Sequence, residues 1–132
     1  MKNRILGLIS LAALLLAGST AVFAHHGAAA YDTGKPTTLK GTVTEFKFMN
    51  PHTEIFLDVA DASGKTKNWL AELGGVTGLS RVGWTPHMLK PGDQITVTGN
   101  RSKNSSNALR LQKVVLPNGK EFNFERGEDY TN

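Results

Sequence analysis

The sequence predicts an all-β domain with one short helix, folded as a small OB-fold-like Greek-key β-barrel of five to six strands. Short segments with alternating apolar and polar residues are separated by turns rich in glycine, proline and aspartate, as expected of antiparallel strands. Between the third and fourth segments the apolar spacing becomes helical, and a helix at that point of a five-stranded barrel gives the OB-fold order. The alternative is another small antiparallel barrel or sandwich.

The first predicted strand begins at Thr37 and is long and bent. Its apolar residues change phase near Thr44-Glu45, which predicts a β-bulge and strong curvature. The segment 49–52, Met-Asn-Pro-His, ends the strand because Pro51 cannot donate a hydrogen bond to a neighbouring strand.

A second strand and a third are predicted to form a hairpin. Ile55, Leu57 and Val59 share one face of the second strand, and the third strand follows over residues 66–73 after a turn at 61–64.

The helix is predicted over residues 76–82, where the apolar residues follow helical spacing. Thr85-Pro86 has the residue types of an N-cap followed by proline at the first helical position, which predicts one further helical turn through Leu89. The remaining predicted segments are a tight turn at 90–93, a fourth strand around Ile95 and Val97, a polar loop at 101–107, a fifth strand at 108–116 and a short sixth at 120–124.

The first 24 residues predict a cleavable secretory signal peptide. Lys2 and Arg4 form a positive start, residues 5–18 are almost wholly apolar, and Val22-Phe23-Ala24 suits a signal peptidase. The apolar run is shorter than the roughly 20 residues that span a bilayer. We therefore expect a periplasmic protein with no membrane span after cleavage. Its parts are an N-terminal arm at 25–36, the barrel domain at 37–125 and a flexible tail at 126–132.

Composition argues against several function classes. The formal net charge is +4, and removal of Lys2 and Arg4 leaves +2, which is too little to predict a nucleic-acid partner. The chain has no cysteine, so thiol enzymes, zinc-thiolate sites and iron–sulfur clusters are excluded. The serine-hydrolase elbow and the zinc-protease motif are absent, so the sequence favours a binding protein over an enzyme.

The four histidines all lie outside the predicted strands. If cleavage follows Ala24, His25 carries the free α-amino group, part of which is deprotonated at neutral pH because its ordinary pKa is about 7.7 to 8.0. The amine and imidazole of His25 can chelate one ion, and His26 adds a second imidazole. Nitrogen ligands of this kind hold copper(II) more tightly than nickel or zinc.

The two methionines of the mature chain each lie beside a histidine, and thioether with imidazole suits copper(I). We therefore predict a copper site whose ligands are His25, His26 and His52, assisted by His87, Met49 and Met88. Ordinary interpretations stay open. His52 can be a turn residue hydrogen-bonded to backbone, His87 and Met88 can pack over the barrel end, and His25-His26 can be an unstructured tip.

Several motifs together resemble a family of small exported bacterial proteins of unknown function. They are His25-His26-Gly27, Tyr31-Asp32, Leu39-Lys-Gly41-Thr-Val43, Asn50-Pro-His52, Trp69 before Glu72-Leu73-Gly74, Gly83-Trp84 and Leu89-Lys-Pro-Gly-Asp93. The opening His-His and the later Asn-Pro-His are the most specific of them. The resemblance implies a periplasmic β-barrel domain without an assigned reaction.

These observations predict a periplasmic binding or accessory module that takes copper as its ligand. The competing hypothesis is a metal-free module of the cell envelope that binds a protein or a small ligand through a barrel face or the loop at 101–107. A copper enzyme is a third hypothesis, although no turnover is expected.

Overall fold

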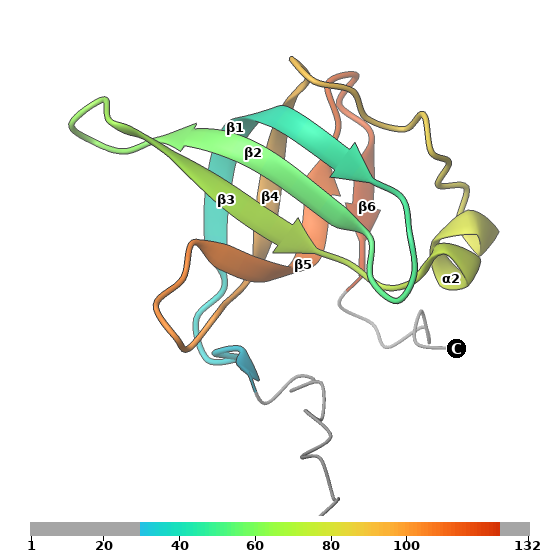
Figure 1. Ribbon diagram of the computed structural model, residues 1–132, viewed down its shortest axis with the longest axis horizontal. Coiled ribbons are helices and arrows are strands. Elements are labelled where there is room, and N and C mark those ends of the chain that lie inside the picture. The colour runs from blue at the N-terminus through green and yellow to red at the C-terminus, as the bar shows by residue number, and fades with distance from the viewer. Residues whose placement is uncertain (1–29, 125–132) are drawn as a thin grey trace, which may run out of the picture.

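The computed structural model describes residues 30–124, and the predicted signal peptide, His25, His26 and the predicted tail lie outside that range. Six strands and one short helix follow the predicted order (Figure 1). Their bounds are β1 Thr37–Lys47, β2 Glu54–Ala60, β3 Thr66–Glu72, α2 Val76–Arg81, β4 Gln94–Arg101, β5 Ala108–Val115 and β6 Glu121–Asn123. The prediction of an all-β domain with one short helix is confirmed.

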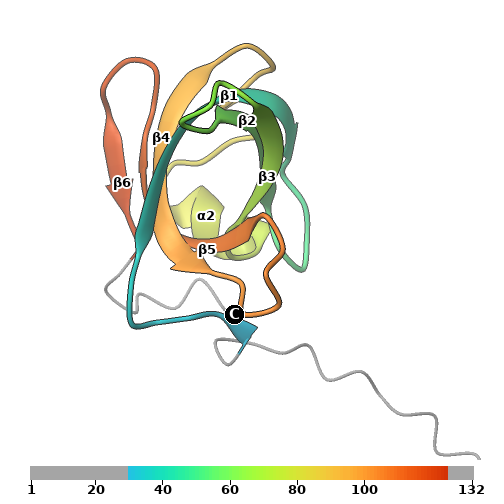
Figure 2. The same cartoon turned by 90° about the vertical axis from the view of Figure 1, so that its left-hand side faces the viewer.

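Five of the strands close into a barrel. The order in the sheet is β3-β2-β1-β4-β5-β6, and β3 also pairs with β5 in parallel, from Leu70 opposite Ala108 to Glu72 opposite Arg110. All other pairs are antiparallel. Figure 2 looks into the resulting ring, with α2 visible through it and β6 outside it as an extra strand on β5.

The length and curvature of β1 let it pair with two partners. Its first half pairs with β4 and its second half with β2, and the β1–β2 register shifts between Val43 and Glu45. This is the predicted β-bulge, which bends a strand and increases its twist. Gly41 lies where β1 runs close to β2, because a Cβ atom there would come within 2.6 Å of the Asp58 carbonyl oxygen.

The core fills the inside of the barrel. Ile55, Leu57 and Val59 of β2 are buried together, as the alternation of the sequence predicted. The α2–β4 loop adds Trp84, which is 2% exposed and packs with its ring centroid 6.0 Å from Phe46 and 5.4 Å from Phe122. One apolar cluster therefore joins the barrel to the segment after the helix.

The helix ends one residue earlier than predicted. Gly83 has a positive φ of 88°, and its N–H donates to Ser80 while the N–H of Trp84 donates to Leu79. These two bonds form a Schellman motif, in which glycine takes the left-handed position that stops a helix.

The prediction of a further helical turn through Leu89 is wrong. Residues 85–88 instead form a single turn, closed by the Met88 N–H donating to the Thr85 carbonyl. Leu89 is buried in the core. Its burial leads the chain into the turn before β4 instead of into a further helical turn.

Candidate functional site

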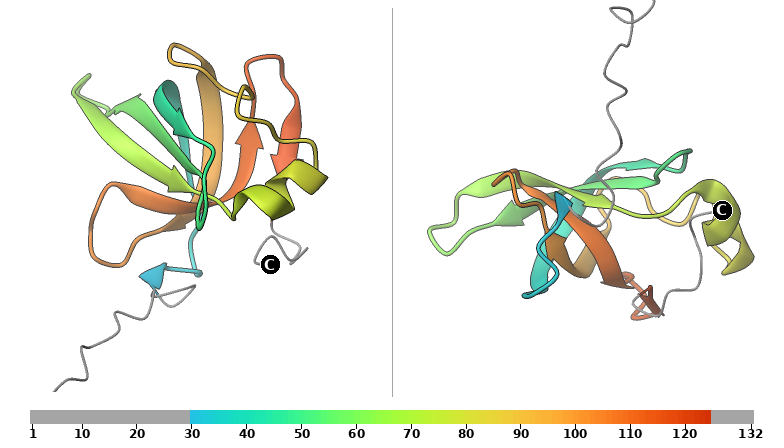
Figure 3. Two further views of the ribbon diagram at one scale, coloured as in Figure 1. Left: turned by 45° about the vertical axis from the view of Figure 1, so that its right-hand side comes forward. Right: turned by 90° about the horizontal axis from the view of Figure 1, so that it is seen from below.

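The Asn-Pro-His segment between β1 and β2 is fastened to the junction of β3 and α2. The Asn50 side-chain oxygen accepts a hydrogen bond from Val76 N–H at 2.9 Å. Thr53 exchanges backbone bonds with this junction, donating to Gly74 at 3.0 Å and accepting from Leu73 at 2.9 Å. The Asn50–Pro51 peptide is cis. The loop therefore lies beside the start of α2 (Figure 3, left), and His52 between these contacts is held next to the end of β3.

His52 belongs to a histidine–glutamate–tyrosine cluster, formed by His52, Glu72 and Tyr31. His52 Nδ1 lies 3.0 Å from Glu72 Oε1, and the Tyr31 hydroxyl donates to Glu72 Oε2 at 3.2 Å. The side chain of Glu72 is 19% exposed and that of His52 is 36% exposed. Each carboxylate oxygen thus has its own contact, and solvent still reaches the cluster.

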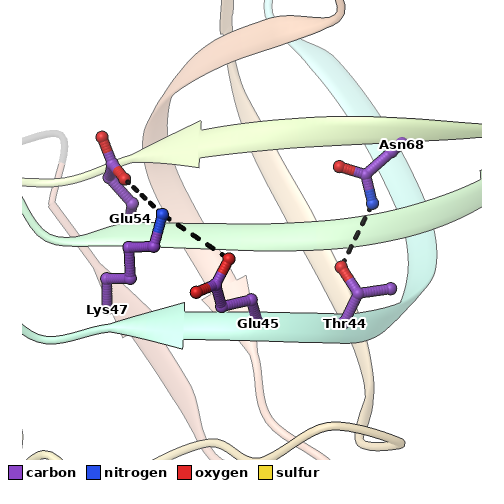
Figure 4. Close-up of polar contacts among 5 residues, drawn as sticks. All are labelled: Thr44, Glu45, Lys47, Glu54 and Asn68. Carbon is purple, nitrogen blue, oxygen red and sulfur yellow. Dashed lines mark hydrogen bonds and ion pairs between the residues drawn. The ribbon is translucent and has the colours of Figure 1, made fainter.

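A row of charged residues crosses four strands at this position. Lys47 pairs in register with Glu54, Glu54 with Glu72, and Glu72 with Arg110. Figure 4 shows the Lys47 ammonium directed at both Glu54, at 3.8 Å, and Glu45, at 3.5 Å. Two cations therefore flank the adjacent carboxylates of Glu54 and Glu72, which offsets the repulsion between like charges directly opposite each other.

Burial raises the pKa of Tyr31 to about 12, and the negative charge of Glu72 and the hydrogen bond to it act in the same direction. Arg110 opposes them by favouring the phenolate. The hydroxyl is therefore protonated at neutral pH and remains a donor to Glu72.

The N-terminal arm reaches the cluster because it docks on the loop between β4 and β5. Tyr31 forms an isolated antiparallel bridge with Ser102, Asp32 N–H donates to Arg101 at 2.8 Å, and Lys103 N–H donates to Ala30 at 3.0 Å. The arm is irregular here, as its composition predicted, yet its backbone has defined partners. Tyr31 is thereby held within hydrogen-bond distance of Glu72, the last residue of β3.

The predicted ligands that the structure describes fall into two loops. Met49 and His52 share the β1–β2 loop, where Met49 is 47% exposed. His87 and Met88 lie in the α2–β4 loop, where His87 is exposed and Met88 packs partly buried against the core. Among residues 30–124, no group of three or more histidine, aspartate or glutamate side chains is placed to hold a metal ion. The copper site stays a prediction.

Sequence reasoning did not single out Glu72 and Tyr31 as partners of His52. The local sequence does not distinguish Glu72 from other carboxylates at strand ends. Tyr31 lies in a segment whose apolar residues follow neither helical nor strand spacing. A signal existed in the β2–β3 hairpin, because pairing Glu54 with Glu72 brings the end of β3 next to the loop that carries His52. The contact with Tyr31 depends on long-range packing that no local pattern reveals.

Within residues 30–124, no helix combines the length and the apolar character needed to cross a membrane.

Comparison with known proteins gives a family and a distant structural likeness. No curated protein matches the sequence. One similar solved structure, the ZRD-deleted mutant of TiaS in complex with agmatine, shares 19% sequence identity and a TM-score of 0.43. The match covers 72% of this chain and 23% of that one, so this chain spans less than a quarter of the other's length. A family of unknown function, DUF6152, matches residues 12–110, which is most of the sequence, and the chain belongs to that family.

Proposed function

We propose that the protein is an exported periplasmic binding module whose mature chain begins at His25 and binds copper. The principal ligands are the amine and imidazole of His25 and the imidazoles of His26 and His52. Met49, three residues before His52, and the pair His87-Met88 assist as weaker ligands, and the two thioethers favour copper(I).

The observation that carries this proposal is the shared contact of Tyr31 and His52 with Glu72. His25 lies six positions before Tyr31 in the sequence. Six extended residues span at most about 20 Å. Since Tyr31 and His52 are separated by a single carboxylate, the start of the mature chain can reach His52.

The chemistry of the ligand set supports copper over other ions. A terminal amine with neighbouring imidazoles is a nitrogen-rich set, and among first-row divalent ions copper(II) binds such sets most tightly. Calcium and magnesium prefer oxygen ligands. The carboxylates near His52 are already engaged by Tyr31, Lys47 or the histidine itself.

The test is calorimetry with copper(II) on protein exported from cells, after mass spectrometry has established that it begins at His25. We expect a dissociation constant of about 1 μM or tighter. Three glycines added before His25 should weaken binding at least about tenfold, because they move the amine away from both imidazoles. His52→Ala should weaken binding by a similar factor, and His87→Ala should have a smaller effect.

The matched control is the same three glycines added after Asn132, which leave the amine untouched and should leave the affinity unchanged. Equal copper affinity of the native and the N-terminally extended chains would show that the amine is not a ligand. If the native chain binds no transition metal, the metal-free module for an envelope protein or small ligand replaces this proposal.

A further inference from the structure

We propose that Glu72 is a positioning residue that sets both the orientation of the His52 imidazole and the docking of the N-terminal arm. The role in copper binding rests on the function proposed above, whereas the positioning itself is a property of the metal-free protein. One carboxylate thus links the two parts of the chain that would supply the ligands.

The first step concerns the proton on His52. A carboxylate accepts hydrogen bonds, so the 3.0 Å contact between His52 Nδ1 and Glu72 Oε1 places the imidazole proton on Nδ1. The lone pair of the neutral ring is then on Nε2. A carboxylate that fixes a histidine in this way is the usual outer partner of a metal-binding imidazole, because it sets both the tautomer and the ring direction.

The second step concerns the arm. The other oxygen of Glu72 accepts the hydrogen bond of Tyr31, and Asp32, the next residue, donates its N–H to Arg101. Loss of the Glu72 charge therefore weakens the hydrogen bond that holds the segment leading back to His25. The arm keeps its backbone bonds to the β4–β5 loop, so it should loosen without detaching.

The third step concerns Glu72 itself, which the fold holds in place. It is the last residue of β3 and pairs with Glu54 on one side and Arg110 on the other. With two strand neighbours and a side chain only 19% exposed, the carboxylate has little freedom to leave His52. A side chain so restricted can orient its partners at a small cost in entropy.

The test uses the metal-free mature chain. Nitrogen-15 NMR at pH 8 reports the tautomer of His52, and His52→Ala assigns its signals. We expect the Nδ1–H tautomer in the native chain and a clear rise of the Nε2–H tautomer in Glu72→Gln. A native Nε2–H tautomer, or the same tautomer in both proteins, would overturn the proposal.

Hydrogen exchange at the Asp32 amide reports the docking of the arm. It should become about tenfold faster in Tyr31→Phe, which loses the bond to Glu72, and faster to a smaller extent in Glu72→Gln, which loses the charge that strengthens that bond. Tyr31→Phe should retain the native His52 tautomer, because the histidine contact is untouched. Unchanged exchange in both variants would refute the link to the arm. Glu45→Gln removes an equal charge from an exposed position on β1 and should change neither measurement.

Copper calorimetry then separates this inference from the proposed function. If copper binds, Glu72→Gln should lower the affinity about ten- to a hundredfold, as the loss of an outer partner usually does. Equal binding by the native and Glu72→Gln chains would overturn the positioning role while the copper function stands. If the native chain binds no copper, the copper function fails, and NMR and exchange still decide whether Glu72 positions His52 and the arm.

Discussion

At the scale of single residues, the most informative group is the Glu72 carboxylate. Carboxylates at strand ends are usually solvated, but here both oxygens have side-chain partners, His52 and Tyr31. The two partners come from segments that are distant in the sequence. A substitution of Glu72 therefore affects contacts of both the β1–β2 loop and the N-terminal arm.

The titration of Tyr31 gives a direct measure of this contact. In a Tyr130→Phe background Tyr31 is the one remaining tyrosine, and its ultraviolet absorbance should titrate with a pKa of about 12. Glu72→Gln should lower this pKa towards 10 without fully restoring it, because burial is the larger cause and stays in place. A pKa near 10 in the Tyr130→Phe protein itself would contradict the docked arm.

The raised pKa of Tyr31 also determines how its contribution to the stability of the folded protein depends on pH. A group whose pKa is raised in the folded protein stabilises it fully below the pKa of the unfolded chain, which is about 10 for tyrosine. The contribution is lost as the pH rises from about 10 towards 12. Tyr31→Phe should therefore flatten the stability profile in that window, as measured by urea unfolding.

The local sequence predicted part of this cluster. Proline at position 51 indicated a break after β1, which placed His52 in a loop, and the structure agrees. Glu72 and Tyr31 could not be assigned as its partners, because their contacts need the pairing of β2 with β3 and the docking of the arm on the β4–β5 loop. His25 and His26 lie outside the described residues, so their role stays a prediction.

At the scale of elements, β4 and β5 meet at an irregular pairing that depends on a glycine. The register shifts between Thr98 and Gly99, where the two strands approach closely. A Cβ atom at position 99 would lie 2.8 Å from Leu109 Cδ1 and would overlap the carbonyl oxygen of Arg110. Backbone cannot move aside as a flexible side chain can, so this position requires glycine.

Gly99→Ala should consequently destabilise the protein by at least about 2 kcal/mol, since overpacking a tight site forces the backbone to shift. Urea unfolding at pH 7 measures the change. The matched control is Gly34→Ala in the arm, where the nearest neighbour of a Cβ atom is an exposed Asp32 side-chain oxygen at 3.3 Å, and its effect should stay within about 0.5 kcal/mol. Equal stability of the two variants would contradict the close approach of β4 to β5.

The elements themselves followed from the sequence more fully than the site did. Alternation and turn residues predicted five strands and a possible short sixth, and the phase change near Thr44 predicted the bulge, because alternation records which side of a strand is buried. The extra helical turn at 85–89 was wrong for a different reason. Thr85-Pro86 has the residue types of a helix start, but burial of Leu89 draws the chain into β4.

At the scale of the molecule, the described residues share one apolar core. Trp69 on β3 and Trp84 in the α2–β4 loop are the two tryptophans of the chain, and both belong to the same buried cluster. Arg101 covers the ring of Trp69 at 4.8 Å, whereas Trp84 is surrounded by phenylalanines. The two rings thus report on two different surroundings within one packed unit.

The barrel should therefore unfold in a single transition. In Trp69→Phe, the fluorescence of Trp84 should follow the same urea midpoint as far-ultraviolet circular dichroism, and the same agreement should hold for Trp69 in Trp84→Phe. Both variants are expected to be less stable than the native chain, because each trims a buried ring. Two separate midpoints within one variant would indicate that the segment after α2 unfolds independently.

The pairing of β1 with β4 also has a kinetic consequence. It pairs Thr37 with Gly99, roughly sixty positions further along the chain. The pairing of β3 with β5 likewise needs a strand that comes later in the sequence. Topologies dominated by such distant contacts fold slowly, in about milliseconds to seconds. A ribosome adds about 5 to 20 residues per second, so β1 and β3 emerge seconds before β4 and β5, with which they must also pair. During that delay a nascent chain carries open strand edges, and a chaperone that shields them would raise the yield of native protein.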